Sequence, residues 1–119
     1  MKLLTKVLED QLKRAGLRNA EFMKYEGETL DFMPVVKLFC PWGSATWLLT
    51  EIDPENPDIA FGLCDLGMGC PEIGSVSLSE LAEIKGPGGL TIERDLYFEP
   101  KKTLSGYADE ARRIGRINA

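Results

Sequence analysis

Residues 34–76 alternate short apolar runs with turns rich in proline and glycine, and this pattern constrains the fold more than any other feature of the chain. The runs favour β structure because each is short and consists mainly of β-branched, aromatic and aliphatic residues. Pro41–Ser44 has the composition of a tight turn, so the first two runs are expected to form a hairpin. The segment therefore predicts a meander of four antiparallel strands. These strands are expected at Val35–Cys40, Ala45–Ile52, Ile59–Asp65 and Glu72–Val76.

The N-terminal residues have the spacing of an amphipathic helix. The apolar side chains that recur at this spacing are Leu8, Leu12 and Ala15. Thr5 is a suitable N-cap, and Gly16 is expected to end the helix. Residues 17–33 show no firm period, so they are expected to form a loop with a weak strand around Glu28–Phe32.

Two further helices are predicted after the meander. Ser77 and Glu80 form a capping box, in which each side chain satisfies a main-chain donor of the other residue, so a short helix begins there. Gly86–Pro87 is expected to end this helix through a left-handed glycine. A last helix is predicted over Thr103–Ile114, and Gly115 ends it. Its expected buried side consists of Leu104, Tyr107, Ala108, Ala111 and Ile114.

The segment Thr91–Phe98 alternates apolar and polar residues after a glycine-rich turn, which is typical of an extended strand at a sheet edge. Alternation places Glu93 and Asp95 together on the solvent face. The apolar face is expected to carry Ile92, Leu96 and Phe98. Arg94 falls on that apolar face, where it needs either a partner or a route to solvent for its head group.

Together these elements predict one α+β domain over residues 1–119, with a four-stranded antiparallel meander, an N-terminal helix, a short capped helix and a C-terminal helix. A hydrophobic fraction of 44% is sufficient for a core. No apolar run approaches the ~20 residues of a membrane span. The first residues lack the pattern of a signal peptide, so a cytoplasmic protein is expected.

The charge of the chain is unevenly distributed. Residues 1–18 and 101–119 each carry a net charge of +3, whereas residues 19–100 carry −11. An acidic middle argues against a dedicated nucleic-acid reader, which normally has a basic stripe across its body. Two interpretations stay open: an acidic surface that binds a basic protein partner, or acidic residues that only keep the protein soluble. The acids of the candidate partner-binding surface are Glu51, Asp53, Glu55, Asp58, Glu93 and Asp95.

Several kinds of chemistry are excluded by composition. The chain has no histidine, which removes His-dependent nucleophilic catalysis and His-ligated zinc. It also lacks a phosphate-binding loop and a dinucleotide fingerprint, so no cofactor is expected. Cys40, Cys64 and Cys70 lack zinc-site spacing, and a fourth ligand would have to come from Asp65 or Glu72. No metal and no catalytic residue are predicted, and the thiols are expected to be idle or, alternatively, to form a disulfide between Cys64 and Cys70.

Two other groups are candidates for contacts. Trp47 is expected in the core, whereas Trp42 lies in a turn and is a candidate for an exposed aromatic contact. Arg112, Arg113 and Arg116 cluster at the end of the last helix. There they complement the helix dipole, and they also form a possible basic patch for a phosphate or an acidic partner.

Five segments together resemble the bacterial family named domain of unknown function 2958. They are Pro34–Phe39, Ala45–Trp47, Phe61–Leu63, Glu72–Leu81 and Gly86–Phe98. The last is the most specific, because a glycine-rich turn is followed by Ile-Glu-Arg-Asp-Leu-Tyr-Phe. The resemblance implies a small protein of plasmids, phages or conjugative elements, sometimes encoded beside antirestriction or DNA-processing proteins, and it implies no particular reaction.

Three function classes follow. The first is a non-enzymatic interaction module whose acidic surface binds a host defence or DNA-processing protein. The second is a nucleic-acid accessory domain that binds through its basic ends, with Lys13, Arg14 and Arg18 acting beside the three arginines of the last helix. The third is an enzyme that uses carboxylates alone, with Asp65, Glu93 and Asp95 as its candidates. They are favoured in that order.

Overall fold

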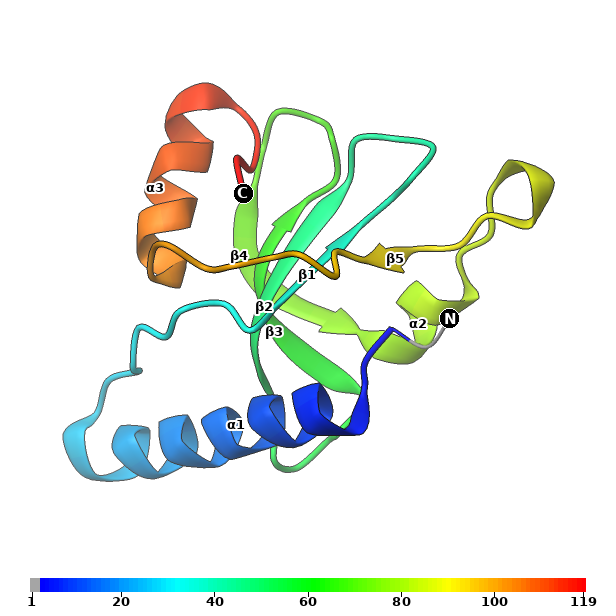
Figure 1. Cartoon of the computed structure of the whole chain (residues 1–119). Helices are drawn as coiled ribbons and strands as arrows, with labels where there is room; N and C mark the ends of the chain where they lie inside the picture. Colours follow the sequence, from blue (N-terminus) through cyan, green and yellow to red (C-terminus); the bar gives the residue numbers. More distant parts are fainter. Residues whose placement is uncertain (1–2) are drawn as a thin grey trace.

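The computed structural model describes residues 3–119 and has an antiparallel sheet with three α-helices packed around it (Figure 1). The helices are α1 (Lys6–Glu26), α2 (Leu78–Glu83) and α3 (Leu104–Ile114), and a 3-10 turn, η1, spans Pro87–Gly89. The strands are β1 (Val36–Phe39), β2 (Thr46–Ile52), β3 (Ile59–Asp65), β4 (Glu72–Ser77) and β5 (Glu93–Arg94). The predicted α+β class is confirmed, with five strands in the sheet rather than four.

The strand order is β4-β3-β2-β1-β5. The first four strands form the predicted meander, and β5 returns to pair with β1, where Arg94 lies opposite Leu38. Arg94 therefore lies on the buried face, as alternation predicts, and it donates to the main-chain oxygen of Leu3 at 2.7 Å. The edge strand is shorter than the predicted segment because the Asp95 side chain accepts from the Tyr97 amide at 2.9 Å and turns the chain. The predicted burial of Leu96 is wrong, since the side chain is 62% exposed in this turn.

The sheet has a hydrophobic cluster on each face. Trp47 and Leu49 of β2 belong to the first cluster, together with Leu12 of α1, whereas Leu48 between them belongs to the second. The full first cluster is Leu12, Val36, Leu38, Trp47, Leu49, Ile52, Ala60, Leu81 and Ile92. The second cluster is Leu48, Leu63, Leu104, Tyr107, Ala108, Ala111 and Ile117, four of which come from α3. Both faces of β2 are therefore covered, which explains its nearly continuous burial.

A β-bulge interrupts this alternation near the end of β2. Leu49 pairs with Gly62 and Glu51 pairs with Phe61, so Thr50 is an extra residue without a partner on β3. Because cross-strand partners share a face, the bulge places Glu51 on the face of Phe61, which packs against the second cluster. Without the extra residue, Glu51 would lie on the face of Trp47 and Leu49, inside the first cluster.

Helix α1 is eleven residues longer than the sequence predicts, since it ends at Gly27 rather than at Gly16. Thr5 caps it as expected, but the helix continues through Gly16 to Glu26 and ends at Gly27, which has a left-handed φ of 73°. Gly16 is buried against the end of β2, and a Cβ atom at this position would overlap the carbonyl oxygen of Ile52. The glycine therefore allows close packing of helix on sheet rather than ending the helix. The weak strand predicted around Glu28–Phe32 is not present, since these residues have no regular structure.

The other helix ends follow the sequence in part. Ser77 caps α2 by accepting from the Glu80 amide at 3.2 Å, as predicted. The left-handed glycine predicted after α2 is wrong, because Ile84 is already extended and Gly86 has a φ of −109°. The predicted last helix is confirmed over Leu104–Ile114, with Thr103 as its N-cap and Gly115 ending it as predicted. Ile114, however, is 43% exposed, and Ile117, beyond the helix, completes the cluster. Within residues 3–119, no helix combines the length and the hydropathy that a membrane crossing requires.

The close packing of α1 on β2 can be tested by replacing Gly16→Ala. Alanine favours a helix over glycine by about 1 kcal/mol, but here its Cβ atom would collide with the main chain of Ile52. We expect the free energy of unfolding to fall by about 1–3 kcal/mol in urea denaturation. The control is Gly106→Ala in α3, where the nearest atom, Cβ of Lys102, lies 3.2 Å from the added methyl. That variant is expected within about 0.5 kcal/mol of the wild type, and an unchanged Gly16→Ala protein would contradict the packing argument.

Candidate functional site

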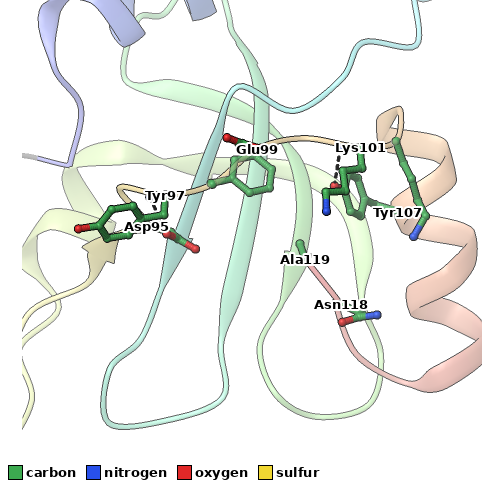
Figure 2. Close-up of a pocket in the computed structure, with 9 residues that line it drawn as sticks. Asp95, Tyr97, Glu99, Lys101, Tyr107, Asn118 and Ala119 are labelled. Atoms are coloured by element: carbon green, nitrogen blue, oxygen red, sulfur yellow. Dashed lines mark hydrogen bonds between the residues drawn. The ribbon is translucent and has the colours of Figure 1, made fainter.

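One cleft lies between the segment after β5 and the C-terminal residues (Figure 2). Residues 95–103 cross the sheet from β5 to the start of α3 (Figure 1). The cleft that they help to line measures about 480 Å³. Its lining consists of Asp95, Tyr97, Phe98, Glu99, Lys101, Lys102, Tyr107, Asn118 and Ala119. Aromatic rings and charged groups of both signs therefore share this surface.

Much of the polar chemistry of this cleft is already used to hold the chain together. Lys37 places its Nζ atom 3.5 Å from Asp95 and donates to the main-chain oxygen of Ala119 at 2.6 Å. Lys102 lies 2.8 Å from Glu110, and the Tyr107 hydroxyl accepts from the Lys101 amide at 2.9 Å, as the dashed line in Figure 2 shows. These contacts attach the crossing segment and the C-terminal residues to the sheet. We interpret the cleft as a structural junction.

The three carboxylates proposed for catalysis are not gathered at one point. Asp65 and Glu93 lie in one cross-strand row, through Thr46 and Phe39, so three strand spacings of about 4.8 Å separate them. That is roughly 14 Å, well beyond the separation at which two carboxylates act on one glycosidic bond. Asp65 is also buried, and it accepts from the amides of Gly67 at 2.9 Å and Ile117 at 3.0 Å. Its evident role is to fix the chain after α3 to the end of β3.

A second, smaller groove has a different character. It measures about 280 Å³ and lies where the C-terminal half of α1 passes the ends of β2, β3 and β4. Its lining is mainly apolar, but one buried carboxylate, that of Glu51, faces it. The residues that line it are Gly16, Asn19, Ala20, Met23, Thr29, Glu51, Asp53, Pro54, Ile59, Phe61 and Ser75. We call this the Glu51 groove.

Glu51 is only 9% exposed, and both of its oxygens lie 3.0 Å from the side-chain nitrogen of Asn19. Asn19 is oriented in turn by the Leu30 amide, which donates to its side-chain oxygen at 2.8 Å. No ion pair within residues 3–119 includes Glu51. Burial raises the pKa of the Glu51 carboxyl above its ordinary value of 4.5, and the negative charge of Asp53 raises it further, while the Asn19 hydrogen bond opposes both.

The six acids of the expected partner surface are separated by the fold, which is a correction to the sequence interpretation. Glu51 is buried, and Glu93 and Asp95 lie at the β5 edge, which β1 separates from β2 and the loop that follows it. Asp58 binds the first turn of α2, accepting from the Ser77 hydroxyl at 2.6 Å and the Ser79 amide at 2.9 Å. These bonds lower the pKa of Asp58 below its ordinary value of 3.8.

The loop and α2 nevertheless present acids together. Asp58 ties the two segments to each other, so the exposed acids of the loop and those of α2 lie on neighbouring parts of the surface. No lysine or arginine occurs between Lys37 and Lys85, so β2, β3, β4 and α2 contribute no positive charge. We call the exposed acids Asp53, Glu55, Glu80 and Glu83 the acidic loop–helix surface.

The aromatic and basic candidates lie elsewhere. Trp42 is only partly exposed, because it packs against the first hydrophobic cluster and its ring lies against the main chain at Gly86. Arg112, Arg113 and Arg116 are exposed at the C-terminal end of α3, with Arg112 3.4 Å from Asp109. The basic residues predicted on α1 do not extend this patch, since the end of α3 that contacts Phe32 and Asp31 near α1 is its N-terminus.

The three cysteines are free thiols, so the alternative of a disulfide between Cys64 and Cys70 is not supported. Burial raises the pKa of the Cys64 thiol to about 11, which leaves it protonated and unreactive at neutral pH. In residues 3–119, no group of three or more cysteine and acidic side chains is arranged to hold a metal ion.

The state of Glu51 can be tested through the pH dependence of stability. Because its folded pKa is raised, its contribution to stability is fully present below the unfolded value of 4.5 and is lost as the pH rises through the folded pKa. We expect Glu51→Gln to gain stability relative to the wild type between pH 4 and pH 7.5 in urea denaturation. Glu55→Gln, at an exposed position four residues away, is the control and should show no such trend. A wild-type advantage that grows with pH would contradict the assignment.

The comparisons with known proteins agree with the resemblance noted in the sequence. A family model described as "Protein of unknown function (DUF2958)" matches residues 3–118 of the 119-residue chain. Neither the curated proteins nor the solved structures include a significant match. Since the match covers both hydrophobic clusters, the Glu51 groove and the acidic loop–helix surface, the chain as a whole belongs to the DUF2958 family.

Proposed function

We propose that the protein is a non-enzymatic interaction module that presents the acidic loop–helix surface to a basic surface of a partner protein. The family resemblance favours a role in plasmids, phages or conjugative elements, with a host defence or DNA-processing protein as the partner. Such partners bind DNA through basic surfaces, which an acidic protein complements.

The observation that carries this proposal is the charge pattern of one part of the fold. Asp53, Glu55, Glu80 and Glu83 are exposed, and no lysine or arginine lies in the chain between β1 and the end of α2. The surface is also held in place, because the Asp53 side chain accepts from the Glu55 amide at 2.8 Å. Fixed acidic groups cost less entropy on binding than mobile ones, and they attract a basic partner over a Debye length of ~8–10 Å.

The two other function classes have less geometric support. Nucleic-acid binding through the basic ends would need the arginines of α1 and α3 to act together, but α3 is about 16 Å long and the arginines lie at its far end. Of the three candidates for an enzyme that uses carboxylates alone, only Glu93 and Asp95 line one cleft, at the β5 edge, whereas Asp65 lies far from Glu93 along their cross-strand row.

The proposal is tested with the triple variant E55K/E80Q/E83K. Glutamine at position 80 keeps the length and the helix propensity of the side chain, and none of the three side chains makes a hydrogen bond or ion pair in the described chain. The wild type is used to capture proteins from a nuclease-treated bacterial lysate, and the captured protein is purified and titrated by calorimetry. We expect the variant to bind at least about tenfold more weakly, a loss of about 1.4 kcal/mol.

The matched control is E21K/E28Q/D109K, which changes the net charge equally at exposed positions outside the acidic loop–helix surface. It should bind within about twofold of the wild type, because rim charges act locally at physiological salt. If both variants lost the same affinity for the partner, net charge alone would explain the loss, and the surface assignment would be contradicted. Capture that disappears with nuclease, together with salt-sensitive shifts of labelled DNA, would favour the nucleic-acid class instead.

A further inference from the structure

The Glu51 groove is built from one wall of helix and one wall of sheet. Asn19, Ala20 and Met23 come from α1, while Phe61 of β3 and Ser75 of β4 lie across from them. The groove volume of about 280 Å³ is at the lower limit of small-molecule sites, which measure ~300–1,000 Å³. A volume of this size suits one long side chain better than a cofactor.

The groove is reached from the edge of the sheet. Ser75, Phe61 and Glu51 are consecutive members of one cross-strand row, and β4 is the edge strand. Two strand spacings, or about 10 Å, therefore separate Glu51 from the edge. Ser75 is exposed and Phe61 is half-buried, so a group that enters past Ser75 would run over an aromatic ring before it meets the carboxylate.

The chemistry of the lining changes from apolar to anionic along this path. Met23, Ile59 and Phe61 offer aliphatic and aromatic surface, whereas Glu51 at the far end and Asp53 beside it carry carboxylates. Lysine and arginine have the matching sequence of groups, a long apolar stem followed by a cation. An aromatic ring along the stem adds a favourable contact for a cation that passes its face.

Within residues 3–119, Glu51 has neither a cation nor the several hydrogen-bond donors that normally accompany a buried carboxylate. An ionised carboxylate has about four acceptor sites, and Glu51 receives one amide nitrogen, that of Asn19, shared between its two oxygens. Burying such a group without a cation costs free energy. A bound ammonium or guanidinium would pair this charge, and it would lower the pKa that burial has raised.

We propose that the Glu51 groove is the receptor for a lysine or arginine side chain of the partner protein, which enters from the β4 edge and pairs with Glu51. This assignment rests on the proposed function, since it specifies how a basic partner is recognised. Charge complementarity selects the occupant, because no cation of residues 3–119 pairs with this carboxylate. Asp53, which lines the groove beside Glu51, and Glu55, two residues further along the loop, are exposed acids that would attract the same partner before the side chain is seated.

The test uses blocked pentapeptides with a central arginine or lysine, added to ¹⁵N-labelled protein and followed by NMR. The reference peptides carry citrulline or norleucine, which keep the stem and lose the charge. With the arginine or lysine peptide, we expect saturable shifts of the Asn19 side-chain amide and of the Phe61 and Ser75 main-chain amides, at millimolar concentrations. The reference peptides are expected to bind at least about tenfold more weakly, a difference of about 1.4 kcal/mol.

Two variants keep the outcome independent of folding. Glu51→Gln removes the charge and keeps an acceptor for Asn19, while Ala20→Leu fills the groove and keeps Glu51, with leucine a good helix former. Both should bind the arginine peptide at least about tenfold more weakly, and their amide spectra report whether the fold is intact. Glu21→Gln, at an exposed position of α1 that does not line the groove, is the matched control and should bind within about twofold of the wild type.

The groove assignment would be overturned by equal binding of arginine and citrulline peptides, by binding that survives both Glu51→Gln and Ala20→Leu, or by the absence of saturable shifts at Asn19. Its failure can be separated from failure of the proposed function. If the partner binds E55K/E80Q/E83K more weakly but binds Glu51→Gln as tightly as the wild type, the acidic loop–helix surface would be supported and the groove assignment would not. If the arginine peptide binds in the groove but the partner binds E55K/E80Q/E83K as tightly as the wild type, the groove assignment would hold and the acidic loop–helix surface would not.

Discussion

The close contact of Gly16 with the carbonyl oxygen of Ile52 determines how the rest of this fold is arranged. Because no side chain separates helix from strand at this point, α1 lies directly on the end of β2 and continues past it. One turn later, Asn19 comes over Glu51, and Ala20 and Met23 become a wall of the groove. The same glycine thus sets the helix–sheet distance and the position of every α1 residue that lines the groove.

The bulge at Thr50 is the second constraint, and it acts on the strand rather than on the helix. It allows Ile52 to remain in the first cluster while Glu51, its neighbour in sequence, lies on the opposite face beside Phe61. A regular strand would place Glu51 between the α1 helix and the apolar residues of that cluster, where an isolated carboxylate is most costly. The bulge instead turns it to the face of Phe61, where the amide of Asn19 reaches it.

The sequence predicts correctly the elements that depend on neighbouring residues. It does not predict the features that depend on a contact between residues far apart in the chain. The four meander strands, the N-caps Thr5 and Ser77 and the end of α3 at Gly115 follow from turn chemistry, capping and periodicity. Gly16 was misinterpreted because its nearest neighbour, Ile52, is 36 positions further along the chain.

The candidate site was harder to predict than the fold, for the same reason. The place of Glu51 beside the acidic loop predicts an exposed side chain, but the bulge, which has no sequence signature here, places it in a buried position. Asn19 carried no signal at all, since it is polar, isolated and 32 positions from its partner. The absence of basic residues from Leu38 to Ile84, in contrast, can be read directly from the sequence, although the fold was needed to show which of the acids remain exposed.

Glu51 makes a poor contribution to the stability of the free protein, and this links the fold to the proposed role. A buried carboxylate held by one amide is less favourable than an apolar residue of similar size, so the position is difficult to explain by packing alone. A bound cation would offset the free energy lost when the Glu51 carboxylate was removed from water. Because the cation binds only the folded state, it would also stabilise that state by linkage. The charged form of Glu51 and an occupied groove would then favour each other. A partner that supplies the cation would bind with its highest affinity above the pH at which Glu51 ionises. The free protein, in which the groove has no cation, would be less stable at that pH.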